Sequence, residues 1–402
     1  MHKRALNDYA AGVTTAPGPT VLDAASLLCE VADELVVRTV RDTHTAWTDR
    51  IHGVGRLATG ATGASMGERV HRGIAGAVYA GLGGGLRLAS TGLDRVAATG
   101  VGPRLEDTRE GRFVSSAVNG LIGDRLLRER PQMAIAMAVR HEGRDVVPDG
   151  PGLAAAFPEP TGRLVVFLHG LCENESYWRR HRERTGSTYA EALAARGWTP
   201  VMLRANTGLP LRENGAALTG LLQQVVEAWP VPVERITLVG HSLGGLVIRA
   251  AGAVAADAPE PWTSRVTDVV TLGTPHLGAP IAWGIGHGSR GLGLLPETAA
   301  FGRLLDWRSA GVHDLVAGLA EDVPPLPHAR YRLVAATLTD SQRHPVGDLV
   351  GDLLVRPRSA YGRDRRGRSL FPDADVLHVG RTDHFGLLNH PQVHTALVQW
   401  LA

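Results

Sequence analysis

The chain has 402 residues, of which 44% are hydrophobic and 20% charged, so it holds enough apolar material for a large folded core. Its formal net charge is +2 and its basic residues are dispersed arginines apart from the single lysine, Lys3, which argues against a nucleic-acid-binding protein. The two cysteines, Cys29 and Cys172, cannot form a disulfide framework; they suit a reducing compartment and leave room for one bridge.

The N-terminus carries no recognisable secretion signal. Its first basic residues are followed by polar residues and by the proline-containing stretch 14–19, where a signal peptide would have an apolar segment. The longest uncharged stretch, residues 73–86, is rich in glycine and shorter than the roughly 20 residues of a membrane-spanning helix. We therefore expect a cytoplasmic protein.

Residues 1–130 predict a helical N-terminal extension. In residues 21–40, apolar side chains recur near helical spacing with acidic residues between them. Weaker patterns of the same kind, with a glycine-rich break at 59–65, cover residues 66–88, 92–98 and 114–127. The plain interpretation of the extension is a packing or oligomer surface. A peripheral membrane contact or a substrate-gating role for residues 73–86 is the alternative.

The pattern changes at residue 131, where a second kind of structure begins. Residues 132–143 alternate between larger apolar and smaller or polar side chains, which predicts a strand. Further apolar runs predict strands at 164–168, 199–203, 236–239, 266–272, 331–335 and 376–379. Helix-length segments at 188–196, 216–229, 243–256 and 393–401 separate or follow them. This alternation predicts an α/β fold with a mostly parallel central sheet and helices on both faces, spanning residues 131–402.

A serine stands between glycines where the run 236–239 gives way to a helical pattern. The segment Gly-His-Ser-Leu-Gly at 240–244 has the strand–turn–helix context of a nucleophile elbow. Small residues at Gly240 and Gly244 fit, because side chains there would collide across so tight a turn, and the turn strains the serine backbone. We interpret Ser242 as a nucleophile; the alternative is a glycine-rich turn that happens to contain serine.

A serine nucleophile needs a base to take its proton and an acid to hold that base. His384 follows the last predicted strand and precedes the last predicted helix, where a loop can bring an imidazole over Ser242. Other histidines suit structural roles better, because they lie beside the serine, in a strand or in the final helix: His241, His378, His390 and His394.

Three aspartates satisfy the order serine, acid, histidine. Asp352 is favoured, because the apolar residues 353–355 behind it would anchor its loop. Asp340, directly after the strand 331–335, and Asp348 are the alternatives.

An oxyanion hole needs a backbone N–H from the elbow and a second from the loop after an earlier strand. Leu243 supplies the first, at the N-terminal end of the helix. His169-Gly170 ends the strand 164–168, so the N–H of Leu171 is the candidate for the second, with Cys172 as second choice. Metal-binding and cofactor-binding motifs are absent, so we expect no metal and no cofactor.

Four blocks together make residues 132–402 resemble an α/β-hydrolase of the bacterial lipase and esterase branch, with motifs related to GPI inositol deacylase-like lipases. They are FLHGL at 167–171, VGHSLGG at 239–245, LGTPHLGAP at 272–280, and GDLLVRPRSA at 351–360 followed by DHFGL at 383–387. The resemblance implies Ser242 as nucleophile, His384 as base, Asp352 as acid, and Leu171 with Leu243 in the oxyanion hole.

The chain departs from that family pattern in several respects, since the secretion signal and the lid disulfide are missing. Secreted lipases of this branch often bind calcium through an acidic residue two positions after the histidine, where this chain has Gly386, so no calcium site is expected. The helical extension has no counterpart in the pattern.

The long connection 280–327 predicts a cap or lid over the serine, since an apolar acyl chain needs cover from water. An ordinary packed helix pair is the alternative.

The sequence thus predicts a serine carboxylic-ester hydrolase, an esterase or lipase, that acts on a small-molecule or lipid ester through an acyl-enzyme. The rival interpretations are an acyltransferase with the same triad and a non-catalytic binding protein on the same fold.

Overall fold

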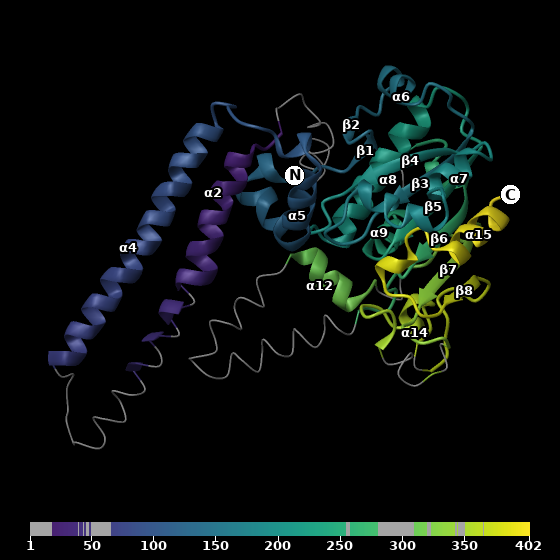
Figure 1. Ribbon diagram of the computed structural model, residues 1–402. Coiled ribbons are helices and arrows are strands. Elements are labelled where there is room, and N and C mark those ends of the chain that lie inside the picture. Colours follow the sequence, from purple (N-terminus) through teal and green to yellow (C-terminus); the bar gives the residue numbers. More distant parts are fainter. Residues whose placement is uncertain are drawn as a thin grey trace. The chain divides into compact units, whose positions relative to one another are not determined.

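The computed structural model (Figure 1) describes residues 18–38, 40–42, 44–45, 48–49, 66–254, 258–279, 309–319, 323–341, 344, 350–364 and 366–402. The contacts divide the chain into two compact units. Of the described residues, those from Gly18 to Gly111 belong to the helical unit and those from Arg112 onward belong to the sheet unit.

Two antiparallel stretches of helix, α2 and α4, are the longest described elements of the helical unit. Helix α2 (Val21–Val31) continues as a π-helix (Ala32–Val37), and α4 spans Met66–Ala97. Thr20 caps α2, since its N–H donates to the Asp23 carboxylate at 2.7 Å and its hydroxyl accepts the Asp23 N–H. The two patterns predicted at 66–88 and 92–98 form this single helix α4.

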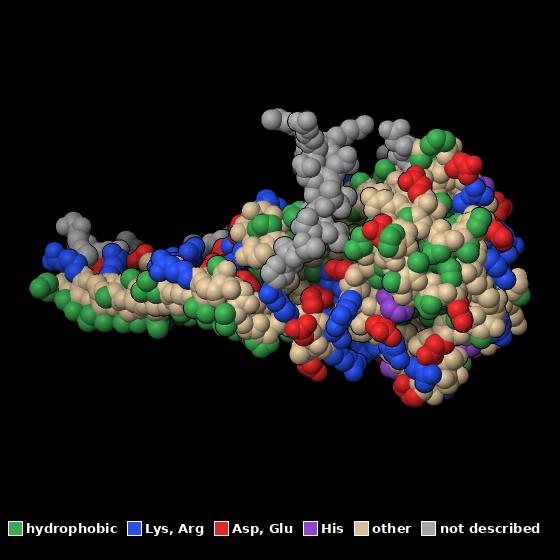
Figure 2. All heavy atoms as spheres, turned by 90° about the horizontal axis from the view of Figure 1, so that it is seen from above, with side chains coloured by type: hydrophobic (Ala, Val, Ile, Leu, Met, Phe, Trp, Pro, Cys, Tyr) green, Lys and Arg blue, Asp and Glu red, His purple; other side chains and the backbone are tan. Residues whose placement is uncertain are grey.

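Helix α4 leaves a row of large apolar side chains uncovered. Met66, Val70, Ile74, Val78 and Leu82, spaced four residues apart, are between 49% and 72% exposed. Figure 2 shows hydrophobic side chains gathered along one edge of this unit and basic side chains along the opposite edge. Among the described helices, none combines the length and the apolar character needed to cross a bilayer.

Helix α5 (Arg109–Glu129) explains why one predicted strand begins late. The Asn119 side chain donates to the Met133 carbonyl at 2.9 Å and accepts the Ile135 N–H at 2.8 Å. These bonds hold the chain after α5 in a 3-10 turn, Pro131–Met133, and an irregular segment. The strand predicted over 132–143 is therefore confined to β1 (Ala138–His141).

The sheet has eight strands in the order β2-β1-β4-β3-β5-β6-β7-β8. After β1 they are β2 (Arg144–Val146), β3 (Arg163–Leu168), β4 (Thr199–Arg204), β5 (Arg235–His241), β6 (Val266–Leu272), β7 (Arg330–Ala336) and β8 (Asp375–Val379). β1 is antiparallel to both its neighbours, and the strands from β4 to β8 run parallel. The predicted mostly parallel sheet is confirmed.

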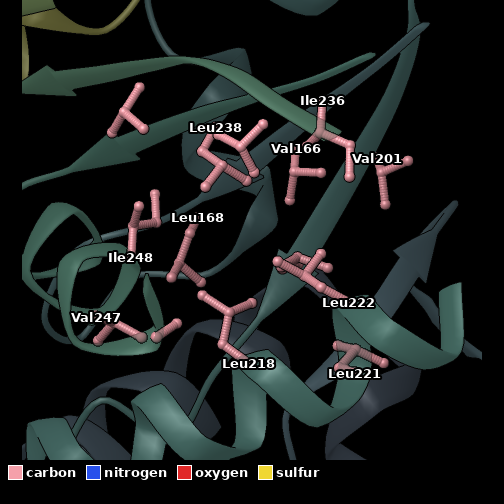
Figure 3. Packing of buried hydrophobic residues seen from close by; sticks show 14 of the residues in the cluster. Val166, Leu168, Val201, Leu218, Leu221, Leu222, Ile236, Leu238, Val247 and Ile248 are labelled. Atoms are coloured by element: carbon pink, nitrogen blue, oxygen red, sulfur yellow. The ribbon is translucent and has the colours of Figure 1, made fainter. Parts of the chain in front are cut away.

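Helices cover both faces of the sheet. On one face α8 (Leu211–Ala228) and α9 (Leu243–Gly252) pack over alternate β3 residues such as Val166 and Leu168 (Figure 3). On the other face α7 (Tyr189–Ala194) and α15 (Pro391–Trp400) share a core cluster with Val165 and Phe167. Neighbouring residues of one strand thus enter different cores, as expected for a parallel sheet buried on both sides.

Short helices complete the described connections. They are α6 (Gly150–Ala156), α12 (Ala310–Ala317), α14 (Pro357–Ala360) and the 3-10 segments Leu105–Asp107, Glu175–Arg179, Arg182–Arg184, Trp262–Arg265 and Phe385–Leu387. Of the predicted cap, residues 309–319 and 323–327 are described and the rest lies outside the described residues. Ser309 anchors α12 to α5, because its hydroxyl donates to the Gly120 carbonyl at 2.7 Å.

The parallel strands all end at the same edge of the sheet. The predicted catalytic segments follow the carboxyl ends of β3, β5, β7 and β8, so their loops meet at that edge.

Candidate active site

Ser242 occupies the turn between β5 and α9. Its backbone has φ 52° and ψ −123°, a left-handed conformation that strains a residue with a side chain. Its N–H donates to the carbonyl of Leu272, the last residue of β6, at 2.9 Å. The strand pairing and this bond hold the serine at the carboxyl edge of the sheet.

Gly240 and Gly244 lie so close to neighbouring backbone atoms that a side chain at either position would collide with them. A Cβ at Gly240 would lie 2.6 Å from the Gly245 nitrogen, across the turn. A Cβ at Gly244 would lie 2.6 Å from the His169 carbonyl oxygen and closer still to that of Leu168. The predicted collision across the turn is thus found at Gly240, whereas the obstacle at Gly244 is the neighbouring strand β3.

His384 and Asp352 form a buried pair. The His384 Nδ1 and the Asp352 Oδ2 are 2.8 Å apart, and the two residues are 3% and 1% exposed. The other carboxylate oxygen accepts the N–H groups of Leu354 and Val355 at 3.0 and 2.8 Å. Because Nδ1 donates to a carboxylate fixed in this way, Nε2 is left as the acceptor of the imidazole. Nε2 is buried and has no hydrogen-bond partner among the described residues.

The His384 ring lies beside the elbow. Its centroid is 4.7 Å from that of His241, the residue before Ser242. A Cβ built on Gly273 would lie 3.0 Å from the His384 Cε1, and Gly273 follows the Leu272 carbonyl that binds the Ser242 N–H. The serine and the histidine therefore share one edge of the sheet.

The alternative acids lie elsewhere. The exposed Asp340 accepts a hydrogen bond from Arg381 at 2.7 Å, and Asp348 lies outside the described residues. The structure thus brings Asp352, and not Asp340, to His384.

The alternative histidines have structural partners. His378 lies in β8 with its Nε2 2.9 Å from the Thr337 hydroxyl. His390 caps α15, and the His394 Nε2 lies 3.0 Å from the Ser187 hydroxyl. Among the described residues, none of these three forms an ion pair with a carboxylate, and the carboxylate beside His241 follows β3 and not β7.

Hydrogen bonds in the loop after β3 favour Leu171 over Cys172 as the second N–H donor of the oxyanion hole. The Cys172 N–H donates to the Thr207 hydroxyl at 3.1 Å, whereas the Leu171 N–H has no acceptor among the described residues. A Cβ on Gly170 would lie 2.9 Å from the Ser242 Cβ, so this loop passes directly beside the serine. Leu243 is the first residue of α9, where a backbone N–H has no acceptor within the helix.

Comparisons with known proteins bear on the fold and the class. Residues 159–283 match the model of a family described as "Putative serine esterase". The chain is similar to the mature lipase BlEst2 of Bacillus licheniformis, with 20% identity over 61% of this chain and 94% of that chain, and a TM-score of 0.42. It is also similar to the esterase PF2001 of Pyrococcus furiosus, with 15% identity over 60% and 81% of the two chains and a TM-score of 0.36. A search of curated proteins finds no match.

The chain has the α/β-hydrolase fold. The parallel sheet and the strained serine between β5 and α9 identify this fold, and the family match spans the same elbow. The family match also agrees with the predicted class, a carboxylic-ester hydrolase. The finer resemblance to GPI inositol deacylase-like lipases stays a prediction.

Sequence reasoning missed one buried residue of this hydrolase, Glu173. It is 3% exposed, and its carboxylate lies 2.9 Å from the His241 Nδ1 and accepts the Gly170 N–H at 2.8 Å. In the sequence it stands in Cys-Glu-Asn-Glu, which looks like an exposed polar loop. No local pattern distinguishes it from Glu175.

Two further buried histidines, His169 and His276, have lowered pKa values that favour the neutral imidazole. Burial lowers the pKa of His169, whose Nε2 accepts the Ala205 N–H at 3.1 Å. Burial, aided by the Arg249 charge, lowers the pKa of His276 to about 3. In the part of the chain that the structure describes, no group of three or more His, Cys, Asp or Glu side chains is placed to hold a metal ion.

We predict that Gly244→Ala destabilises the sheet unit and abolishes esterase activity, because the new methyl group would press on β3 backbone carbonyls that cannot move aside. Thermal unfolding and hydrolysis of a p-nitrophenyl ester measure the two effects. Gly220→Ala is the control, since Gly220 lies in α8 with nothing within 4 Å of its built Cβ; it should raise stability by up to about 1 kcal/mol. Equal behaviour of the two variants would contradict the crowding argument.

Proposed function

We propose that this α/β-hydrolase cleaves carboxylic esters with an apolar acyl group, using Ser242 as nucleophile, His384 as base and Asp352 as the acid that orients the base. The observation that carries the proposal is the buried hydrogen bond between His384 and Asp352, which leaves Nε2 as an acceptor beside the strained serine. No metal or cofactor is needed for this chemistry.

In the first half-reaction the Ser242 Oγ attacks the acyl carbon while the His384 Nε2 takes the hydroxyl proton. Asp352 stabilises the imidazolium through its hydrogen bond to Nδ1. Collapse of the tetrahedral intermediate breaks the bond to the alcohol oxygen, which leaves with the proton from His384. A water molecule, deprotonated by the same Nε2, then attacks the acyl-enzyme and releases the acid.

The negative oxygen of each tetrahedral intermediate would be bound by the N–H groups of Leu243 and Leu171. The first lies at the N-terminus of α9, whose dipole favours an anion. The second lies in the loop whose Gly170 is next to the Ser242 Cβ. The Leu171 N–H has no acceptor in the part of the chain that the structure describes.

Two rival functions use the same fold. An acyltransferase would pass the acyl group to an alcohol instead of water, and analysis of the products in the presence of alcohols distinguishes it. A binding protein without turnover would leave Ser242 unlabelled by a fluorophosphonate, whereas the proposed nucleophile reacts with it.

We also propose that residues 131–402 form the catalytic domain, with residues 280–327 as its cap and residues 1–130 as an extension. Helix α5 lies within this proposed extension, and from Arg112 onward its contacts group it with the sheet unit.

We predict that wild-type protein hydrolyses p-nitrophenyl esters across a series of chain lengths and that Ser242→Ala loses at least about 10³-fold in kcat, because the acyl-enzyme can no longer form. The release of p-nitrophenol is the measurement. Equal rates, or equal inactivity, of the two proteins would exclude the proposed function.

The choice of acid is tested by a pair of matched substitutions. Asp352→Asn should lower kcat by about 10⁴-fold, because the amide no longer holds the imidazole in the required tautomer. Asp340→Asn changes an exposed carboxylate paired with Arg381 and should leave kcat within about 2-fold, since surface pairs contribute little. A larger loss in Asp340→Asn than in Asp352→Asn would reverse the assignment.

For α4 we propose a peripheral contact with a lipid surface, which would bring the enzyme to apolar esters. The helix presents large exposed apolar side chains four residues apart, and it carries four arginines against two acids, which suits an anionic bilayer. We predict that the protein co-sediments with vesicles of phosphatidylcholine and phosphatidylglycerol, and that Val78→Asp weakens binding about 10-fold by placing a charge in the apolar row.

The matched control for that experiment is Val147→Asp, in the sheet unit. Val147 and Val78 are 51% and 53% exposed, so the same substitution changes the same amount of surface. Equal losses in both variants, or no binding by the wild type, would refute a role of α4 at lipid surfaces.

A further inference from the structure

A buried glutamate and histidine lie beneath the proposed site and take no part in the reaction. The Glu173 carboxylate contacts the His241 Nδ1 at 2.9 and 3.0 Å through its two oxygens, and the residues are 3% and 0% exposed. Taking a carboxylate out of water costs several kcal/mol unless it is paired and hydrogen-bonded. Glu173 meets that requirement by accepting the Gly170 N–H as well.

The contacts of His241 determine its charge. Its Nδ1 faces the Glu173 carboxylate, and its Nε2 lies 3.3 Å from the His384 carbonyl oxygen. The carbonyl oxygen is an acceptor only, and so is Glu173 when ionised; burial raises the pKa of Glu173, but the His241 charge and the hydrogen bonds outweigh it and lower that pKa. Both ring nitrogens of His241 therefore carry a proton to donate to these acceptors. A histidine that donates from both nitrogens is an imidazolium cation, and Glu173 supplies the balancing negative charge.

This pair joins three loops that carry the proposed catalytic groups. Glu173 accepts the N–H of Gly170, which directly precedes the Leu171 donor. His241 directly precedes Ser242 in the chain. The imidazole of His241 also contacts the backbone carbonyl of His384. The His384 N–H in turn donates to the Asp352 carbonyl at 3.0 Å. One ion pair thereby ties the oxyanion loop, the nucleophile elbow and the base loop together.

We propose that Glu173 and His241 are positioning residues for ester hydrolysis: their buried ion pair sets the place of the Leu171 N–H and of the His384 imidazole relative to Ser242. This inference rests on the proposed function. It assigns the pair no contact with substrate and no proton transfer.

Among the described residues, three titratable groups surround His241. The titratable groups that face it are Glu173 from the loop after β3, Asp352 from the loop after β7, and the His384 imidazole from the loop after β8. The Trp178 and Phe385 rings cover the remaining sides with centroids 6.4 and 6.1 Å away. Burial disfavours the cation, but the Glu173 charge and hydrogen bond outweigh it and raise the pKa of His241.

The test compares Glu173→Gln with Glu175→Gln. Glu175 is the matched control, because it pairs with Arg140 at 3.0 Å and does not contact Gly170 or His241. Glu173→Gln should lower kcat about 10- to 100-fold with KM within about 3-fold, since the oxyanion donor and the base act in the transition state. Glu175→Gln should retain wild-type kcat and KM.

The pH profile of kcat separates positioning from simple support of the fold. In the wild type the raised pKa keeps His241 charged at neutral pH, and the charge is lost only as the pH rises through that pKa. Without the Glu173 carboxylate, burial lowers the pKa, so His241 loses its proton at a lower pH. The alkaline limb of the kcat profile should therefore move to lower pH by about one unit or more in Glu173→Gln, and it should stay in place in Glu175→Gln.

The double variant Glu173→Gln/His241→Gln completes the test. If the two residues act as a unit, the double variant should lose about as much kcat as either single variant. Additive losses, an unmoved pH profile, or a Glu173→Gln protein that fails to fold while Glu175→Gln folds would overturn the proposal. An inactive wild type, or activity independent of Ser242, would instead defeat the proposed function, so the two failures are distinguishable.

Discussion

The turn between β5 and α9 leaves no room for side chains at Gly240 and Gly244, two residues before and after Ser242. The other groups of the site are arranged around this turn. Ser242 takes a left-handed backbone conformation there, and Gly240 approaches the Gly245 backbone too closely for a Cβ. Gly245 itself packs against Thr274, where an added Cβ would lie 2.8 Å from the threonine Cγ2. The serine is thus fixed by its contacts with both neighbouring strands, β3 and β6, and its geometry depends on the whole centre of the sheet.

Around that turn, two buried carboxylates are held by backbone N–H groups and imidazoles. Asp352 is held by two backbone N–H groups and the His384 imidazole, and Glu173 by one backbone N–H and the His241 imidazole. Each carboxylate would be costly without these partners, because an unpaired buried charge loses its hydration. The result is a set of loops whose positions depend on one another, on top of a core that is apolar on both faces of the sheet.

Several details could not be read from the sequence. Asp340 and Asp352 both satisfied the order of the triad, and only the folded loops show that Asp340 faces Arg381 at the surface while Asp352 meets His384. Leu171 and Cys172 were adjacent candidates, and the difference is a long-range bond from the Cys172 N–H to Thr207. The strand predicted from residue 132 was shortened because Asn119, in the preceding helix, binds the backbone at 133 and 135.

The sequence by itself determined the parallel strands, most of their helices, and the serine elbow, because each depends on local periodicity or on the size of adjacent residues. Only the tertiary structure decided that Asp352 pairs with His384, that the Cys172 N–H is used by Thr207 while the Leu171 N–H finds no acceptor among the described residues, and that Glu173 is buried beside His241. Those facts depend on contacts between loops that are distant in the chain. A side chain in such a loop has the same local pattern whether it faces water or a buried partner, so its role becomes visible only once the strands have brought the loops together.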